Sequence, residues 1–434
     1  MGADAGPGDS ARSGGFLDYE PRPPLPDDAR ACSFRHALCV HAVHAASALP
    51  ASPKTRQAAE AQVLAWLAAA DRAWDVATGA LALPSPDGQL DLYLVAGDPY
   101  ATRTLLDRRD ASAGYDRVSA FALAGRGAVP GCALDTAAAR VVAHAVLFGV
   151  APATDEGSAT AESAYMASLM SPCAGGLGGL DAGVAYFQAH PEVGLADTLA
   201  PPSESMALDV SLPVVESPGE IYGSGVALFY DWVDRSFGRY PGAIVRAMWA
   251  LSPTLTPGGA ARWHDDPDGF EVLRTSFKNA LTTGSTVDDL WLDFAVARAF
   301  EPRFPVRKEW SIGWPSAPRS LMSGVGVAPT GAAYVSVDCA NRPKGARLRF
   351  EARWEEHARF LWSLVRVDAE GHEISRVGVP AQDRGTEAQA TLVDLDGTAR
   401  VLVVGTNTGD PATHFDPDDY VWEPHGWIVS LAGE

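Results

Sequence analysis

Hydrophobic and polar residues follow one another with two different periods along the chain, and the change of period predicts where helices and strands lie. Between about residues 55 and 300, apolar residues recur with helical spacing, most clearly in 55–78, 222–237 and 240–251. After about residue 308, short runs rich in Val, Leu, Trp and Phe are separated by turn signals such as Asp-Gly. We therefore predict a helix-rich region followed by a region of strands.

Shorter apolar runs complete the first region. Residues 91–96 and 117–124 are rich in strand-forming residues and predict two strands. A helix over about 135–149 follows, with Asp135 as its capping residue, and the next helix is expected over 155–170. Two more helices are predicted at 268–281 and 286–300. Helices around a small mixed sheet make this region an α+β domain.

Three parts of the chain differ in composition. Residues 1–30 are rich in Gly, Pro and Asp and are predicted to form a flexible tether. Residues 31–303 are predicted to form the α+β domain, and residues 304–434 an all-β sandwich of six to eight short strands. The strand predictions in the sandwich are 333–338, 346–351, 361–367, 390–395, 400–405 and 426–431.

The charge balance limits the classes of partner. The chain has 54 acidic and 34 basic residues, a net charge of −20. Nucleic acids and anionic membranes attract clustered Lys and Arg, so neither is an expected partner, whereas cationic partners or calcium are compatible. The candidate calcium ligands lie in two acidic turns, with solvated turn chemistry as the alternative. They are Asp266, Asp268, Asp416 and Asp418. No run of 18 apolar residues exists, so no transmembrane helix is predicted.

The spacing of the five cysteines indicates the cellular compartment of the protein. Cys32 lies close to Cys39, and a bond between Cys132 and Cys173 would close a loop of roughly 40 residues, leaving Cys339 over. Such pairs favour an extracytoplasmic protein, periplasmic, on the outer-membrane surface or secreted, with five unpaired cytosolic thiols as the alternative. The Gly- and Ser-rich start is typical of the tether of a bacterial lipoprotein, so a lipid anchor upstream of residue 1 is a hypothesis.

The segment Val141–Ala153 carries the main functional signal. Zinc peptidases place H-E-x-x-H on a helix, where the two His bind the metal and the Glu is the general base. In this chain His144 occupies the first His position, but Ala145 stands at the Glu position and Phe148 at the second His position. The pattern therefore predicts a peptidase scaffold without peptidase chemistry.

Several weaker motifs follow in the order that peptidases use. Glu156 lies in an E-G-x-A element, and Glu162 is either its trailing acid or the equivalent of the third zinc ligand. Further along, Tyr222-Gly223 is followed by a helical segment that ends near Trp249. Residues 55–300 thus resemble the gluzincin-type zinc metallopeptidases in degenerate form. The resemblance implies a helix-rich domain with a small mixed sheet, in which SAFALA, residues 119–124, forms an edge strand before the helix at the zinc-helix position.

The residues at the two altered motif positions predict whether the protein binds zinc and hydrolyses peptides. Catalytic zinc takes three protein ligands and a water, whereas Phe148 has no lone pair and Ala145 cannot accept a proton. We therefore expect no catalytic residues and no zinc, and a role in binding or scaffolding with a protein or peptide partner in the degenerate cleft. Two alternatives stay open: a metal-dependent hydrolase with ligands rearranged around His144, Glu156 and Glu162, or a structural subunit of an extracellular assembly.

Two other clusters of residues each allow two interpretations. His36, His41 and His44 are predicted to lie on one helical face, with a metal site as the alternative. Aromatic residues near the end of the chain are predicted to belong to the sandwich core, with a sugar- or peptide-binding strip as the alternative. They are Tyr420, Trp422 and Trp427.

Overall fold

The computed structural model divides into two compact units. Unit 1 comprises residues 1–184 and 198–273, and unit 2 comprises residues 185–197 and 274–434. The residues that the structure describes are 19–20, 22–23, 27–44, 52–107, 119–152, 154–171, 173, 177–195, 213–252, 269–270, 272–273, 287–382, 385–409 and 423–434.

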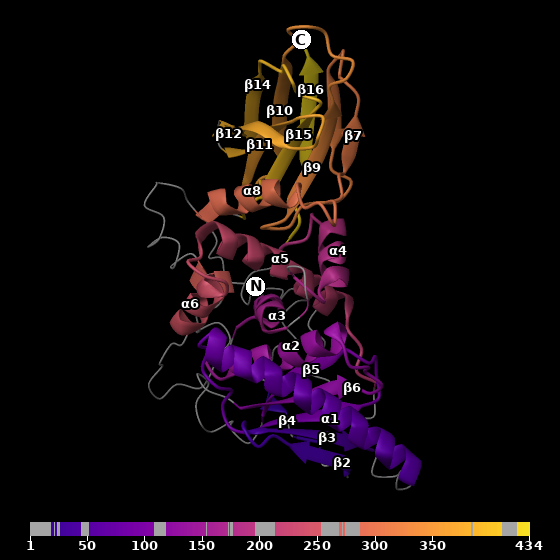
Figure 1. The fold of residues 1–434 in the computed structure, drawn as a ribbon. Coiled ribbons are helices and arrows are strands. Elements are labelled where there is room, and N and C mark those ends of the chain that lie inside the picture. The colour runs from indigo at the N-terminus through magenta and orange to yellow at the C-terminus, as the bar shows by residue number, and fades with distance from the viewer. Residues whose placement is uncertain are drawn as a thin grey trace, which may run out of the picture. The chain divides into compact units, whose positions relative to one another are not determined.

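A six-stranded mixed sheet lies in unit 1, in the order β1-β5-β6-β4-β3-β2 (Figure 1). Its strands are β1 (Tyr19–Glu20), β2 (Asp27–Cys32), β3 (Leu38–Val43), β4 (Leu90–Val95), β5 (Thr102–Asp107) and β6 (Ala120–Gly125). The three central strands β3, β4 and β6 run parallel. All six residues of β6 are buried, and β6 pairs with β4 and β5. The expectation of an edge strand at 119–124 is therefore wrong, because this apolar run fills an interior position.

Helices cover this sheet and then form a layered group. They are α1 (Pro53–Asp75), a π-helical turn (Val76–Ala80), α2 (Cys132–Phe148), α3 (Glu156–Met170), α5 (Pro218–Phe237) and α6 (Ala243–Leu251). Helix α4 (Asp181–Ala189) begins in unit 1, and its residues from 185 onward belong to unit 2. Helix α1 packs on β2 and β3, α2 packs on β5 and β6, and α3 packs on both α2 and α5. Among the described helices, none has the length and apolar character needed to span a bilayer.

The N-terminal part of unit 1 differs from the prediction. Residues 36–44 do not form a helix, since β3 lies there with all six residues buried. Pairing on both sides, with β2 and β4, stabilises an apolar run of this length as an interior strand. Asp27 already belongs to β2, so the described part of the predicted tether 1–30 contributes strands to the sheet.

Unit 2 contains two five-stranded sheets, β13-β14-β10-β16-β8 and β12-β11-β15-β9-β7. Their strands are β7 (Trp310–Ile312), β8 (Arg319–Met322), β9 (Ala332–Asp338), β10 (Leu348–Trp354), β11 (Phe360–Val367), β12 (Glu373–Val379), β13 (Ala381–Gln382), β14 (Glu387–Leu392), β15 (Arg400–Asn407) and β16 (Trp427–Gly433). Side chains of both sheets, including Phe350 and Val403, share one buried core. The mixed α+β class is thus confirmed.

A helix from the predicted α+β domain belongs to unit 2. Helix α8 (Val287–Arg298) packs on β11 and β15, and Ala295 and Val296 share a second core with Tyr334. The hydroxyl of Tyr334 donates to the Ala295 carbonyl oxygen at 2.6 Å. The sheet β12-β11-β15-β9-β7 is therefore buried on two faces, and the compact unit begins before the predicted boundary at residues 303 and 304.

Candidate functional site

His144 lies one turn before the end of α2, on a half-buried stripe of the helix. Phe148 follows one turn later, and its ring centroid lies 5.0 Å from that of His144. Burial, followed by the nearby positive charge of Arg140, lowers the pKa of the His144 imidazole to about 4. The imidazole is therefore neutral at ordinary pH, and an aromatic ring occupies the space beside it where a second ligand would stand.

Glu162 lies in the middle of α3 and its side chain is buried. Its Oε2 accepts the indole N–H of Trp249 at 2.6 Å, and its Oε1 accepts the hydroxyl of Tyr230 at 3.2 Å. Burial raises the pKa of the Glu162 carboxyl to about 8, the Trp249 hydrogen bond opposes this, and the charge of Asp155 adds to it. Glu162 thus links α3 to α5 and α6 as a buried acid.

The candidate ligands do not form one set in the described residues. Glu156 is exposed in the first turn of α3. In the described part of the chain, the potential metal ligands that do converge are Cys39, His41 and Asp91. This group includes none of the peptidase-motif candidates His144, Glu156 and Glu162. Among the acidic-turn candidates, Asp266, Asp268, Asp416 and Asp418 lie outside the described residues.

The three clustered His each have a different carboxylate partner. Nε2 of His36 lies 2.9 Å from Asp75, and Nδ1 of His44 lies 2.8 Å from Asp28. His41 lies between Asp27 and Asp91. The three imidazoles therefore do not share one ion, and sequence spacing alone did not reveal their partners.

Both predicted disulfides are present. Cys32 is bonded to Cys39 at a paired position of β2 and β3, and Cys132 at the start of α2 is bonded to Cys173. Cys339 is a free thiol buried in the core of unit 2. The predicted pairing is thus confirmed for all four residues.

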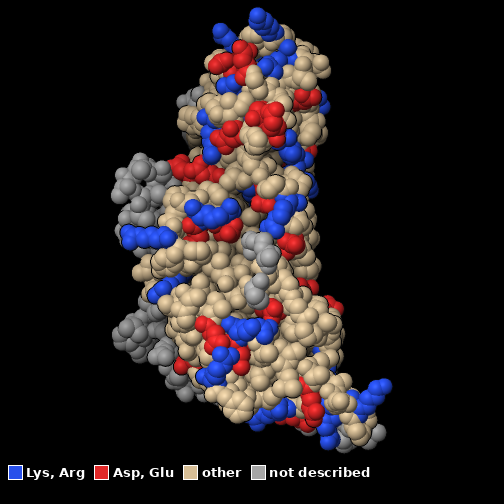
Figure 2. Space-filling model, in the orientation of Figure 1, with Lys and Arg blue, Asp and Glu red and all other residues tan. Residues whose placement is uncertain are grey.

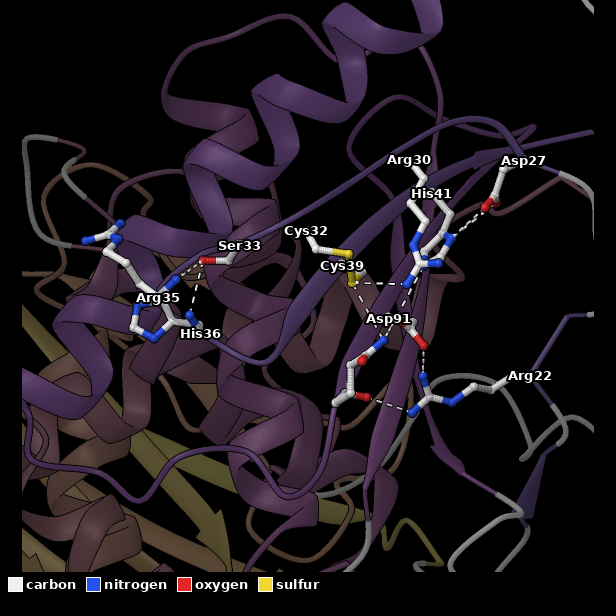
Figure 3. The surroundings of a disulfide bond; sticks show 11 residues. Arg22, Asp27, Arg30, Cys32, Ser33, Arg35, His36, Cys39, His41 and Asp91 are labelled. Carbon is white, nitrogen blue, oxygen red and sulfur yellow. Dashed lines mark hydrogen bonds and ion pairs between the residues drawn. A yellow bond between two sulfur atoms is a disulfide. The ribbon is translucent and has the colours of Figure 1, made fainter.

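Charged side chains surround the first disulfide (Figure 3). Arg22 forms ion pairs with Asp91 and Asp107. Nη2 of Arg30 lies 3.5 Å from Sγ of Cys39. Burial lowers the pKa of His41, although the charge and hydrogen bond of Asp27 oppose this shift.

A pocket of about 510 Å³ opens in unit 2, and we call it the sandwich-end pocket. Its walls are residues 322–326, 353–355, 424 and 426–428, which follow β8, end β10 and begin β16. Met322, Val325 and Ile428 are exposed there, beside the charged side chains of Arg353 and Glu355. The volume and mixed lining are those of a small-ligand or peptide site.

Two tryptophans line the sandwich-end pocket. Trp354 and Trp427 are buried, and their indole nitrogens have no hydrogen-bond partner in the described structure. Trp427 packs edge to face on Trp362, which agrees with its predicted place in the core. Tyr420 and Trp422 lie outside the described residues. Sequence reasoning found Trp427 but missed the pocket, because three distant segments build it.

No protein-family model and no curated protein matches this chain. Among solved structures, the pre-peptidase C-terminal domain of a Bacillus anthracis collagenase is 11% identical, covering 30% of this chain and 97% of that domain with a TM-score of 0.19. The surface-associated copper-binding protein CorA of Methylomicrobium album is 7% identical, covering 28% and 97% with a TM-score of 0.19. At such low TM-scores, these likenesses establish neither a shared fold nor a shared function.

Proposed function

We propose that this protein is an extracytoplasmic binding protein that works without hydrolytic chemistry, and that the sandwich-end pocket holds a peptide segment of its partner. The pocket is the observation that carries this proposal. Two disulfides support a location outside the cytoplasm. The expected cleft beside His144 contributes less, because Phe148 packs against that imidazole.

A peptide fits the lining of the pocket. Exposed Val325 and Ile428 offer an apolar surface for a side chain of the peptide, and the charged side chains of Arg353 and Glu355 stand beside it. A hydrogen bond fixes two segments of the pocket wall to each other, since Oε2 of Glu355 accepts the backbone N–H of Gly426 at 2.9 Å. A preformed wall lowers the ordering cost of binding.

The charge of the chain indicates which peptides it would prefer. On the face drawn in Figure 2, Lys and Arg side chains of the described residues lie among Asp and Glu side chains. With a net charge of −20, the chain attracts cationic peptides over long range. We therefore propose a partner segment that carries an apolar residue next to a Lys or Arg.

Selection from a random peptide library against the intact protein tests this function. Selected peptides should bind at least tenfold more weakly to Val325→Lys, which removes an apolar contact and repels the cationic residue of the peptide. Val393→Lys is the matched control, because Val393 is 50% exposed and Val325 52% exposed, but Val393 lies outside the pocket. Equal binding to both variants, or failure to select any peptide, would refute the pocket as the partner site.

We also propose that unit 1 is a degenerate relative of zinc metallopeptidases. The helix that carries His144 and the partner helix α3 support this reading, with Ala145 and Phe148 at the lost catalytic positions. Metal analysis of protein purified without chelator tests it, together with assays of peptide hydrolysis. Stoichiometric zinc that His144→Ala abolishes, or chelator-sensitive cleavage, would instead favour a hydrolase with rearranged ligands.

A further inference from the structure

A sulfur, a nitrogen and an oxygen of the ligand type converge beside the Cys32–Cys39 disulfide. Cys39, His41 and Asp91 are buried, and one ligand atom from each lies within 4.8 Å of the others. Cys39 and His41 are two residues apart on β3, so their side chains share a face of the sheet. Asp91 is the parallel partner of Cys39 on β4. The sheet register therefore fixes the triad.

His41 is oriented in the way that metal-binding imidazoles are. Its Nδ1 lies 3.1 Å from Oδ1 of Asp27, and its Nε2 lies 3.3 Å from Oδ1 of Asp91. A neutral imidazole has one N–H and cannot donate to both carboxylates. When the proton is on Nδ1, the Nε2 lone pair faces a carboxylate oxygen. A cation between these two atoms would replace this lone-pair contact with two ligand bonds, and Asp27 would then hold the imidazole ring in place.

Two guanidinium groups and one amide adjoin this site. Arg22 binds Oδ2 of Asp91, whereas Oδ1 lies 3.3 Å from Nε2 of His41 and accepts the side-chain amide N–H of Gln89 at 2.6 Å, so a bound cation would displace this amide. Arg30 lies 3.5 Å from Sγ of Cys39, and a guanidinium beside a free thiol favours the thiolate, which is the form that binds metals. In the oxidised chain, Cys39 is bonded to Cys32 and supplies no thiolate.

We propose that reduction of the Cys32–Cys39 disulfide opens a site for one divalent ion of the zinc class, with Cys39, His41 and Asp91 as ligands. A dithiol supplies two electrons and two protons: its own sulfurs join as a disulfide, the Cys32–Cys39 bond breaks, and both cysteines become thiols. Metal binding then releases the proton of Cys39. Exposed Cys32 gives the reductant access and offers the fourth ligand. The mixed sulfur, nitrogen and oxygen set excludes calcium as the preferred ion.

Cys32→Ser tests the site, because it frees Cys39 without a reductant and leaves Cys132–Cys173 intact. Titration with Co²⁺ should show one equivalent with thiolate-to-cobalt charge-transfer absorption, which Zn²⁺ removes by competition. Adding His41→Asn to this variant should weaken binding at least tenfold. Adding His36→Asn is the matched control and should leave the titration unchanged, since His36 pairs with Asp75 outside the triad.

A second route keeps the natural cysteines. The wild-type chain is reduced with a dithiol, desalted without air and titrated with Co²⁺, beside a His41→Asn chain treated in the same way. His41-dependent binding supports the proposal, because a site built on the other freed cysteines would not depend on His41. Absence of binding in folded Cys32→Ser and in the reduced wild type, or equal binding with and without His41, would overturn it. Neither result bears on the peptide pocket of unit 2.

Discussion

The indole N–H of Trp249 lies 2.6 Å from Oε2 of Glu162, although the two residues are 87 positions apart in the chain. Tyr230 approaches the other oxygen of the same carboxyl group. Three helices, α3, α5 and α6, therefore meet at one buried acid. The buried surroundings favour the neutral form of the Glu162 carboxyl over its charged form. The stability of unit 1 therefore depends on pH.

Glu162→Gln should remove a pH dependence of stability. Burial raises the pKa of Glu162 from 4.5 to about 8, so the folded chain binds the proton more tightly than the unfolded chain. Stability from this group is fully present below pH 4.5 and is lost as pH rises toward 8. The loss is on the order of 3 kcal/mol. The amide keeps the contacts, accepting from Trp249 and donating to Tyr230.

Urea unfolding at about pH 5 and about pH 8 measures the difference between the wild type and Glu162→Gln. Glu60→Gln is the matched control, since Glu60 is exposed on α1. His144 acts in the opposite sense, because its folded pKa is lowered to about 4, but it is present in every variant and cancels in the comparison. Parallel pH profiles for the wild type and Glu162→Gln would contradict the prediction.

Asp234→Asn should destabilise unit 1 more than Tyr165→Phe. The carboxylate of Asp234 accepts the hydroxyl of Tyr165 at 2.5 Å and the backbone N–H groups of Gly242 and Ile244, which open α6. The substitution replaces one acceptor oxygen with an N–H donor, which then faces the other donors. We therefore expect the free energy of unfolding to fall by roughly 2 to 4 kcal/mol. Tyr165→Phe removes one bond and should cost about 1 kcal/mol. Thermal unfolding measures both, and equal losses would show that the cap contributes nothing.

Arg298→Lys should destabilise unit 2. Arg298 is 3% exposed, donates to Gln188 and to the carbonyl of Phe187, both at 2.8 Å, and stacks 3.8 Å from the Phe187 ring centroid. Lysine cannot reproduce the planar fork, so the expected loss is about 2 kcal/mol or more. Arg349→Lys is the exposed control and should stay within about 0.5 kcal/mol. Calorimetry measures the melting temperatures of the two variants. Equal melting temperatures would contradict the prediction that Arg298 stabilises unit 2.

Removing the Cys132–Cys173 bond should cost more than removing the Cys32–Cys39 bond. The first pair is separated by 41 positions and the second by 7, and the longer loop restricts the unfolded chain more. Chain-entropy arguments give about 4 kcal/mol for the first and about 2.5 kcal/mol for the second. Paired Cys→Ala variants, unfolded in urea without reductant, measure the two losses. A larger loss for the short loop would show that native contacts outweigh chain entropy.

Local patterns predicted much of the fold. The helix expected at 155–170 is Glu156–Met170, and the strand expected at 361–367 is Phe360–Val367. The start of α5 is encoded within four residues, because Ser217 and Glu220 form a capping box. Signals of this kind lie within a single helix or strand, so the sequence displays them directly.

The long-range parts could not be predicted. Leu38–Val43 is apolar except for His41 and is too short to distinguish a helix from a strand. Its two strand neighbours decided the outcome. The partners of Glu162 and of His41 come from other elements, at positions that no spacing indicates. His144 was found by a motif, yet its surroundings depend on packing that the motif does not contain.

Unit 2 takes residues 185–197 from the middle of the chain as well as the C-terminal part, so the polypeptide passes between the two units three times. A protease that cuts one of these passages leaves the units covalently joined through the other two. Limited digestion should therefore nick the protein long before it yields a free fragment of either unit.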